Sequence, residues 1–126
     1  MDYELSLLNK LRVGDIIHAN SPNCPSLICL VTNVSDSHLF TRNITMQFEI
    51  KFDIQTGKGN RGAKNDICTI DSIAPLPLDI HNIMLRLDRL FRLLPEKRDH
   101  THLSADEKNA IIFIDNFYRK NPLVSN

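Results

Sequence analysis

Apolar and charged residues alternate along the middle of the chain, from residue 48 to residue 54. The apolar positions are Phe48, Ile50, Phe52 and Ile54. A period of two places these side chains on one face of a β-strand and the charged side chains on the other. The pattern predicts an antiparallel strand with one buried face. It lies within a strand-like stretch, 39–54, whose alternation is poorer at 43–47, where we expect a bend or a hairpin turn.

Three further segments have the composition of strands. Gly14 and Asp15 stand between apolar residues and predict a tight turn that leads into a first strand. Segment 27–34 is rich in Leu, Ile and Val and predicts a strand buried on both faces. A last short strand is expected at 68–73, where a Pro-x-Pro sequence follows. With the two strands of 39–54, the total is about five.

The apolar spacing changes to that of a helix in the last third of the chain. Apolar residues recur at helical spacing across 80–94, and Asp79 is available as the N-cap. Ser104 and Glu107 have the spacing of a capping box, which predicts the start of a second helix. The leucines within 3–11 predict a short amphipathic helix that must dock on the rest of the chain.

These elements predict an α+β fold. We expect a small curled antiparallel sheet or an SH3-like, partly open barrel of about five strands, preceded by a short N-terminal helix and capped by two C-terminal helices. Residues 1–126 are predicted to form a single domain, in which the β unit (1–77) and the two-helix unit (78–126) share one core. Each unit alone would be too small to bury a sufficient core.

Charge and cysteine content restrict the expected partners and compartment. The chain has 15 Lys and Arg against 15 Asp and Glu, so its formal net charge is zero. A neutral chain lacks the strongly basic character typical of domains that bind nucleic acids or membranes. Its three cysteines cannot all pair with one another, and the N-terminus has no apolar leader pattern. We therefore expect reduced thiols, a cytoplasmic location and no membrane partner.

A glycine-rich segment, 57–64, is the first candidate binding site. Lys58, Arg61 and Lys64 follow one another at intervals of three with no acid between them. Small neighbouring residues allow phosphate groups to approach the backbone, so the segment suits contact with nucleic acid or phosphate. The alternative is a solvated connection between strands that the basic residues keep soluble.

A second basic group lies on the first predicted C-terminal helix. Arg86 and Arg89 are one turn apart and therefore neighbours on the helix surface. They would extend the glycine-rich segment into one basic patch if the fold placed the two side by side. The alternative is a solvated helix face whose arginine stems cover apolar surface.

Candidates for metal binding and catalysis are weak. His100 and His102 follow Asp99, but no further ligand stands at a metal-site spacing, so a polar linker is the favoured interpretation. Cys24 and Cys29 do not have a zinc or redox spacing, and Cys29 lies in a predicted core strand. No Gly-x-Ser-x-Gly or His-Glu-x-x-His motif occurs. We therefore assign no catalytic, metal or cofactor residue from the sequence and expect no cofactor.

The sequence Leu11-Arg-Val-Gly-Asp-Ile-Ile17 resembles the opening of SH3-like and related small β-barrels. Such barrels commonly begin with an apolar-x-x-Gly-Asp turn that leads into a first strand. The resemblance covers residues 11–73 and implies a module that binds peptides or nucleic acids rather than an enzyme. The chain departs from this pattern in its aromatic residues, with no Trp, two Tyr and six Phe, few of which could line a peptide groove.

Taken together, the sequence predicts a non-catalytic binding or accessory protein. The expected partner is another protein or a second copy of the chain, bound through the C-terminal helices or an exposed sheet edge. A regulatory or immunity-type factor of a bacterium or a mobile element would have this character. The alternative is a module that binds nucleic acid or phosphate through 57–64.

Overall fold

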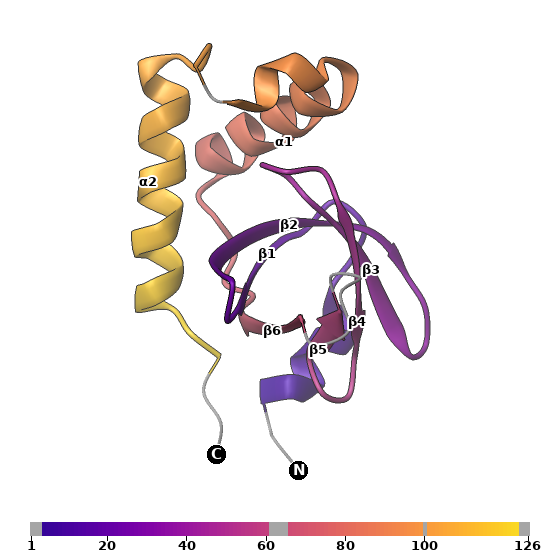
Figure 1. Cartoon of the computed structure of the whole chain (residues 1–126). Helices are drawn as coiled ribbons and strands as arrows, with labels where there is room; N and C mark the ends of the chain where they lie inside the picture. The colour runs from indigo at the N-terminus through magenta and orange to yellow at the C-terminus, as the bar shows by residue number, and fades with distance from the viewer. Residues whose placement is uncertain (1–3, 61–65, 100, 124–126) are drawn as a thin grey trace.

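The structure of the chain, a computed structural model, describes residues 4–60, 66–99 and 101–123. Six antiparallel strands form a closed barrel with two α-helices packed outside it (Figure 1). The strands are β1 (Ile16–Ser21), β2 (Cys24–Val34), β3 (His38–Asn43), β4 (Glu49–Asp53), β5 (Lys58–Asn60) and β6 (Ile67–Ser72). The helical segments are the 3-10 helices η1 (Glu4–Lys10) and η2 (Pro95–Asp99) and the α-helices α1 (Leu78–Leu93) and α2 (Ala105–Lys120). No helix in the described part of the chain is long and apolar enough to span a membrane.

The strands follow one another around the barrel in chain order, and β6 pairs with β1 to close it. The α+β class and the two C-terminal helices are confirmed, but the predicted five strands and partly open barrel are corrected to six strands and a closed one. The missed strand is β5, which lies inside the predicted glycine-rich connection. A Cβ on Gly59 would lie 2.6 Å from the carbonyl oxygen of Lys51, so this glycine lets β5 approach β4 closely enough to pair.

The turn predicted before the first strand is present. Gly14 has a φ of +98°, in the left-handed region that favours glycine. Its amide donates to the carbonyl oxygen of Val31 at 2.9 Å, and the Val31 amide donates to that of Asp15 at 2.8 Å. The turn therefore joins the start of β1 to β2.

Two apolar clusters lie on the two sides of the barrel wall. The inner cluster fills the barrel and includes Ile17, Leu27, Val31 and Phe52. The outer cluster joins the barrel wall to the helices; its wall residues are Ile16, Ile28, Leu30 and Ile44, and its helix residues include Met84, Leu87, Phe91, Ile114 and Tyr118. The strand 27–34 was predicted to be buried on both faces, and its residues 27–31 are indeed all buried.

The helices begin and end largely where the sequence indicates. Ser104 and Glu107 form the predicted capping box, in which each side chain bonds the backbone N–H of the other residue. Asp79 is not the N-cap of α1: the helix starts at Leu78 after Pro77, and Asp79 lies in its first turn. There the carboxylate still faces the positive end of the helix dipole. The predicted N-terminal helix is present as the 3-10 helix η1.

A buried ion pair fastens α1 to the barrel. Asp88 is 3% exposed and accepts two hydrogen bonds from Arg42 of β3, at 3.0 and 2.7 Å. Gln47 donates a further bond to Asp88 at 2.9 Å. Burial alone would raise the pKa of Asp88, but these hydrogen bonds and the charge of Arg42 outweigh it and lower the pKa below the ordinary 3.8. Asp88 therefore stays ionised inside the helix–barrel contact.

Replacing Asp88 by Asn should cost about 3 kcal/mol of the free energy of unfolding, because the half-buried guanidinium of Arg42 loses its counter-charge. Urea denaturation at pH 7 measures this. Glu49→Gln, at an exposed acid paired with Arg42 across the strands, is the control and should change stability by less than about 0.5 kcal/mol. The lowered pKa means that the stabilisation by Asp88 is present above about pH 4 and is lost as the pH falls further. Equal stability of wild type and Asp88→Asn at pH 7 would contradict this account.

Candidate functional site

The structure does not unite the two basic groups that the sequence singles out. Lys58 is exposed on β5, whereas Arg86 and Arg89 are exposed on α1. In the closed ring β5 stands opposite β2, whose outer face packs against the helices, so Lys58 and the two arginines lie on different sides of the barrel (Figure 1). Arg61 and Lys64 lie outside the described residues.

A surface depression of about 420 Å³ lies beside Lys58 on the outer wall of the barrel. Its lining residues come from β3, β4, β5 and β6 and are His38, Lys51, Asp53, Lys58, Gly59, Asn60 and Ile67. Asp53 caps the turn after its strand by accepting from the backbone amides of Gln55 and Thr56. The lysines Lys51 and Lys58 are exposed at the rim. The depression is thus polar and mildly basic.

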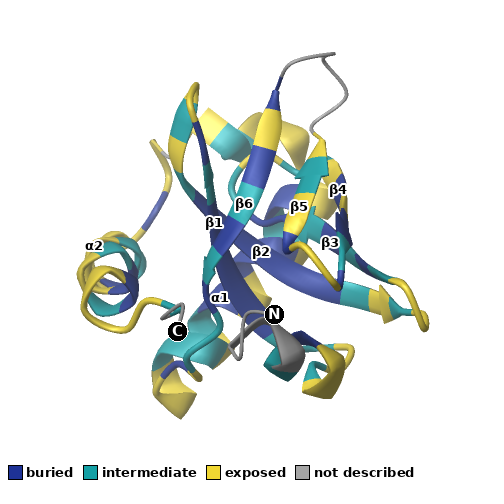
Figure 2. Ribbon diagram, turned by 90° about the horizontal axis from the view of Figure 1, so that it is seen from below, coloured by how far each residue is buried: buried dark blue, intermediate teal, exposed yellow. Residues whose placement is uncertain are grey.

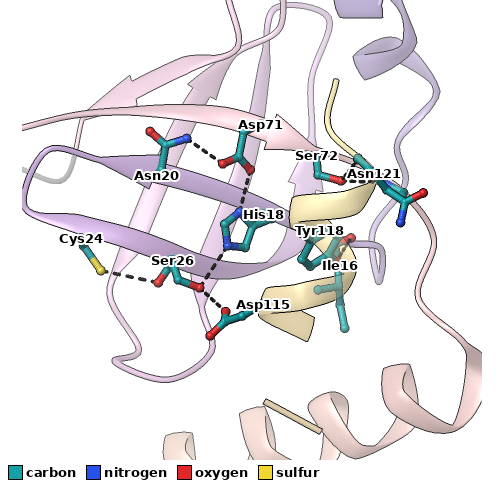
Figure 3. A network of polar contacts seen from close by, with 11 residues as sticks. Ile16, His18, Asn20, Cys24, Ser26, Asp71, Ser72, Asp115, Tyr118 and Asn121 are labelled. Atoms are coloured by element: carbon teal, nitrogen blue, oxygen red, sulfur yellow. Dashed lines mark hydrogen bonds and ion pairs between the residues drawn. The ribbon is translucent and has the colours of Figure 1, made fainter. Parts of the chain in front are cut away.

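The most connected polar cluster lies elsewhere, between the barrel and α2 (Figure 3). His18 of β1 is its centre and is 7% exposed. Its Nδ1 lies 2.6 Å from a carboxylate oxygen of Asp71, and its Nε2 lies 3.0 Å from the hydroxyl oxygen of Ser26. Ser26 donates to Asp115 of α2 at 2.5 Å, and Asn20 donates to the second oxygen of Asp71 at 2.7 Å. We call these five residues the His18 network.

Strand periodicity explains why these side chains meet. His18 and Asn20 alternate with Ile17 and Ala19, which point into the barrel, so the two polar residues point outward. Ser26 and Asp71 are outward positions on the strands to either side, β2 and β6. Helix α2 then places its inner side over this wall and adds Asp115 (Figure 2).

The hydrogen-bond pattern defines the charge of the network. Ser26 has a single proton, which it donates to Asp115, so its oxygen accepts from Nε2 of His18. Nδ1 of His18 faces a carboxylate of Asp71 and must donate to it. All contacts are therefore satisfied by an imidazolium cation held between two carboxylates.

The distances around Ser26, His18 and Asp71 resemble those of a serine–histidine–aspartate triad. In such a triad the neutral imidazole takes the serine proton. Here Asp115 holds that proton already, and an imidazolium cannot act as the base. Neither Ser26 nor His18 lines the depression beside Lys58 or a second one of about 270 Å³ beside Pro75 and His81. The arrangement suits fastening a helix better than activating a nucleophile.

Further contacts continue the docking of α2 toward the C-terminus. The hydroxyl of Tyr118 donates to the carbonyl oxygen of Ile16 at 3.2 Å, and its ring lies 5.0 Å from that of His18. Burial raises the pKa of Tyr118, so this donor keeps its proton. The hydroxyl of Ser72 donates to the carbonyl oxygen of Asn121 at 2.5 Å. The inner side of α2 is thus held by polar contacts along its C-terminal half.

The metal and thiol candidates of the sequence gain no support. Within the described residues, no group of three or more His, Cys, Asp or Glu side chains is placed to hold a metal ion. Asp99 accepts from the amide and the hydroxyl of Thr101 and so forms a turn, and His100 lies outside the described residues. Cys24, Cys29 and Cys68 are thiols rather than disulfides. Burial raises the pKa of Cys29 to about 12, which makes this thiol a poor nucleophile.

Sequence reasoning missed the His18 network altogether. His18 and Asp71 are 53 positions apart, and Ser26 and Asp115 are 89 apart, so no local motif could join them. The available signal was a polar residue at alternate positions within otherwise apolar strands, as at His18 and Asn20. It identifies outward polar positions but not their partners.

No protein-family model matches the sequence, and no curated protein or solved structure is significantly similar to it. Function is therefore argued from the chain's own residues.

Ser26→Ala should loosen α2, because it leaves Asp115 and Nε2 of His18 without their shared partner. We expect a loss of about 2 kcal/mol of the free energy of unfolding, measured by urea denaturation, and faster amide hydrogen exchange in α2 than in β3 and β4. Ser37→Ala is the matched control, because Ser37 also bonds a histidine ring but at an exposed turn. Unchanged stability and exchange in Ser26→Ala would show that the network does not hold the helix.

Proposed function

We propose that the chain is a non-catalytic protein-binding module and that it binds its partner through the side of α2 that faces away from the barrel. We call this side the outer face of α2; it consists of the exposed residues Asp106, Asn109, Ile112, Phe113, Asn116 and Arg119. The thiol state of its cysteines suits the reducing cytoplasm, where we place it as an accessory or regulatory factor.

The observation that carries this proposal is the exposure of large apolar side chains on a helix that is already docked. Ile112 is 61% exposed and Phe113 is 40% exposed, although the opposite side of α2 buries Ala110, Ile114 and Tyr118. The ring of Phe113 stacks on that of Phe117, with centroids 5.7 Å apart and planes 25° apart. A rigid aromatic pair beside an exposed Ile is typical of the anchor residues of protein interfaces.

Helix α1 adds to the apolar surface of the helical unit. Leu78 is 75% exposed and Leu93 is 66% exposed, at its two ends. Single exposed leucines are normal on folded proteins and need no explanation. The contiguous apolar residues of α2 therefore support the proposal more strongly than the separated leucines of α1 do.

The chemistry of the polar cluster supports a function without catalysis. Ser26 is the residue in it that a hydrolase would use as nucleophile, and its proton is already bound by Asp115. Cys29 is a core residue with a raised pKa. A binding role asks nothing of either group beyond holding the fold.

Replacing Phe113 by the photoreactive residue p-benzoylphenylalanine tests the proposal inside the cell. On illumination we expect a discrete covalent adduct with a protein, because this position faces the proposed interface. The additional substitution Ile112→Asp should reduce the adduct at least tenfold, because it places a charge in the apolar patch.

The matched control carries the same photoreactive residue in place of Phe40, a half-buried aromatic residue on the outer wall of β3. This position should give no comparable adduct. Absence of a protein adduct from position 113, or an equal adduct from position 40, would refute the proposed interface.

A second candidate function, binding of nucleic acid or phosphate, is favoured by one observation. The depression beside β5 has Lys51 and Lys58 at its rim and the amide side chain of Asn60 in its wall. Ammonium groups can pair with phosphates, and an amide can donate to them. The site borders the glycine-rich segment, whose Arg61 and Lys64 would add charge.

Changing Lys51 and Lys58 to Ala tests this second function. If the depression binds phosphates, affinity for a mixed-sequence single-stranded oligonucleotide falls with salt, and the double variant flattens the slope of log K against log salt by about 0.7 for each lost phosphate contact. Lys108→Ala with Lys120→Ala, two exposed residues of α2, is the control and should leave the slope unchanged. No binding by the wild type at 20 mM salt would rule this function out.

A further inference from the structure

We infer that the partner of the outer face of α2 is a second copy of the chain, packed with its own α2 antiparallel to the first. The inference rests on the proposed function, since it names the partner of the same surface. It is carried by the way charge is distributed along the helix.

The two ends of the outer face carry opposite charges. Asp106 lies in the first turn of α2, and Arg119 lies in the last turn. Ile112 and Phe113 lie midway between them. A two-fold axis through the midpoint of the helix therefore brings Ile112 and Phe113 against the same residues of the second copy. The same axis places Asp106 of each copy beside Arg119 of the other.

Helix geometry allows both ion pairs to form together. Asp106 and Arg119 are 13 positions apart, which is about 20 Å along a straight α-helix at a rise of 1.5 Å per residue. Arg119 donates to the side-chain oxygen of Asn116 at 3.3 Å, a contact that keeps its guanidinium along the outer face. A parallel pair would instead set Asp106 against Asp106 and Arg119 against Arg119, which disfavours that orientation.

The remainder of the molecule leaves room for this packing. Helix α2 runs along the flank of the barrel with its exposed side directed away from it (Figures 1 and 2). The formal net charge of zero means that two copies do not repel each other over long range. A single helix pair is smaller than a standard stable interface, so we expect a dissociation constant on the order of 10–100 µM.

Sedimentation of the purified chain between 5 and 500 µM tests the inference. Wild type should change from monomer to dimer over this range. Asp106→Lys alone and Arg119→Asp alone should each weaken the dimer at least tenfold, because each places like charges at both ends of the pair. Circular dichroism confirms that both variants are folded.

Mixing the two variants provides the decisive arm. In the mixed dimer Lys at 106 faces Asp at 119, while Arg119 of the first variant faces Asp106 of the second, so both ion pairs are restored. We expect the mixture to dimerise with near wild-type affinity. Arg86→Asp, at an exposed position of α1, is the charge control and should leave the dimer unchanged.

The outcomes separate this inference from the proposed function. A monomer at 500 µM, together with an adduct of another protein at position 113, overturns the second copy and leaves the proposed function standing. A monomer with no protein adduct overturns both. Dimerisation that Asp106→Lys and Arg119→Asp do not weaken, or that mixing does not restore, overturns the antiparallel arrangement.

Discussion

The arrangement of the whole chain depends on the burial of the barrel wall at β1 and β2 from both sides. Leu27 and Val31 point into the barrel, and Ile28 and Leu30 point out of it, yet all four are buried. A wall with two apolar faces cannot be exposed to water without losing a large share of its hydrophobic stabilisation. The helices must therefore cover it, which makes them part of the folded unit rather than appendages.

Covering this wall also determines which surfaces remain available. The inner side of α2 is committed to Tyr118, Ile114 and the His18 network, so the other side of the helix is presented to solvent in a fixed orientation. Stacked rings continue from the exposed surface inward: Phe113 on Phe117, Phe117 against Tyr118, and Tyr118 against His18. The network that holds the helix thus also supports the exposed aromatic residue at the proposed interface, and preorganised anchors lower the entropic cost of binding.

Local patterns predicted those parts of the fold that local physics determines. The alternation in β4, the doubly buried segment of β2 and the capping box at Ser104 are each visible within a short stretch of sequence. Strand β5 was missed because three residues, one of them Gly59, carry no periodic signal. Asp79 was misassigned because Pro77 precedes a helix that starts without a side-chain cap. The His18 network was missed because its members come from three strands and a helix, and only closure of the barrel brings them together.

Native-state hydrogen exchange of the full chain tests the central claim, that the helices and the β1–β2 wall form one folded unit. The account predicts that the most protected amides of α1 and α2, around Met84, Leu87 and Ile114, exchange with the same free energy and denaturant dependence as those of Leu27–Val31. Exchange of both helices at a much lower free energy than β2 would contradict it. That result would mean that the barrel is stable with its outer apolar face uncovered.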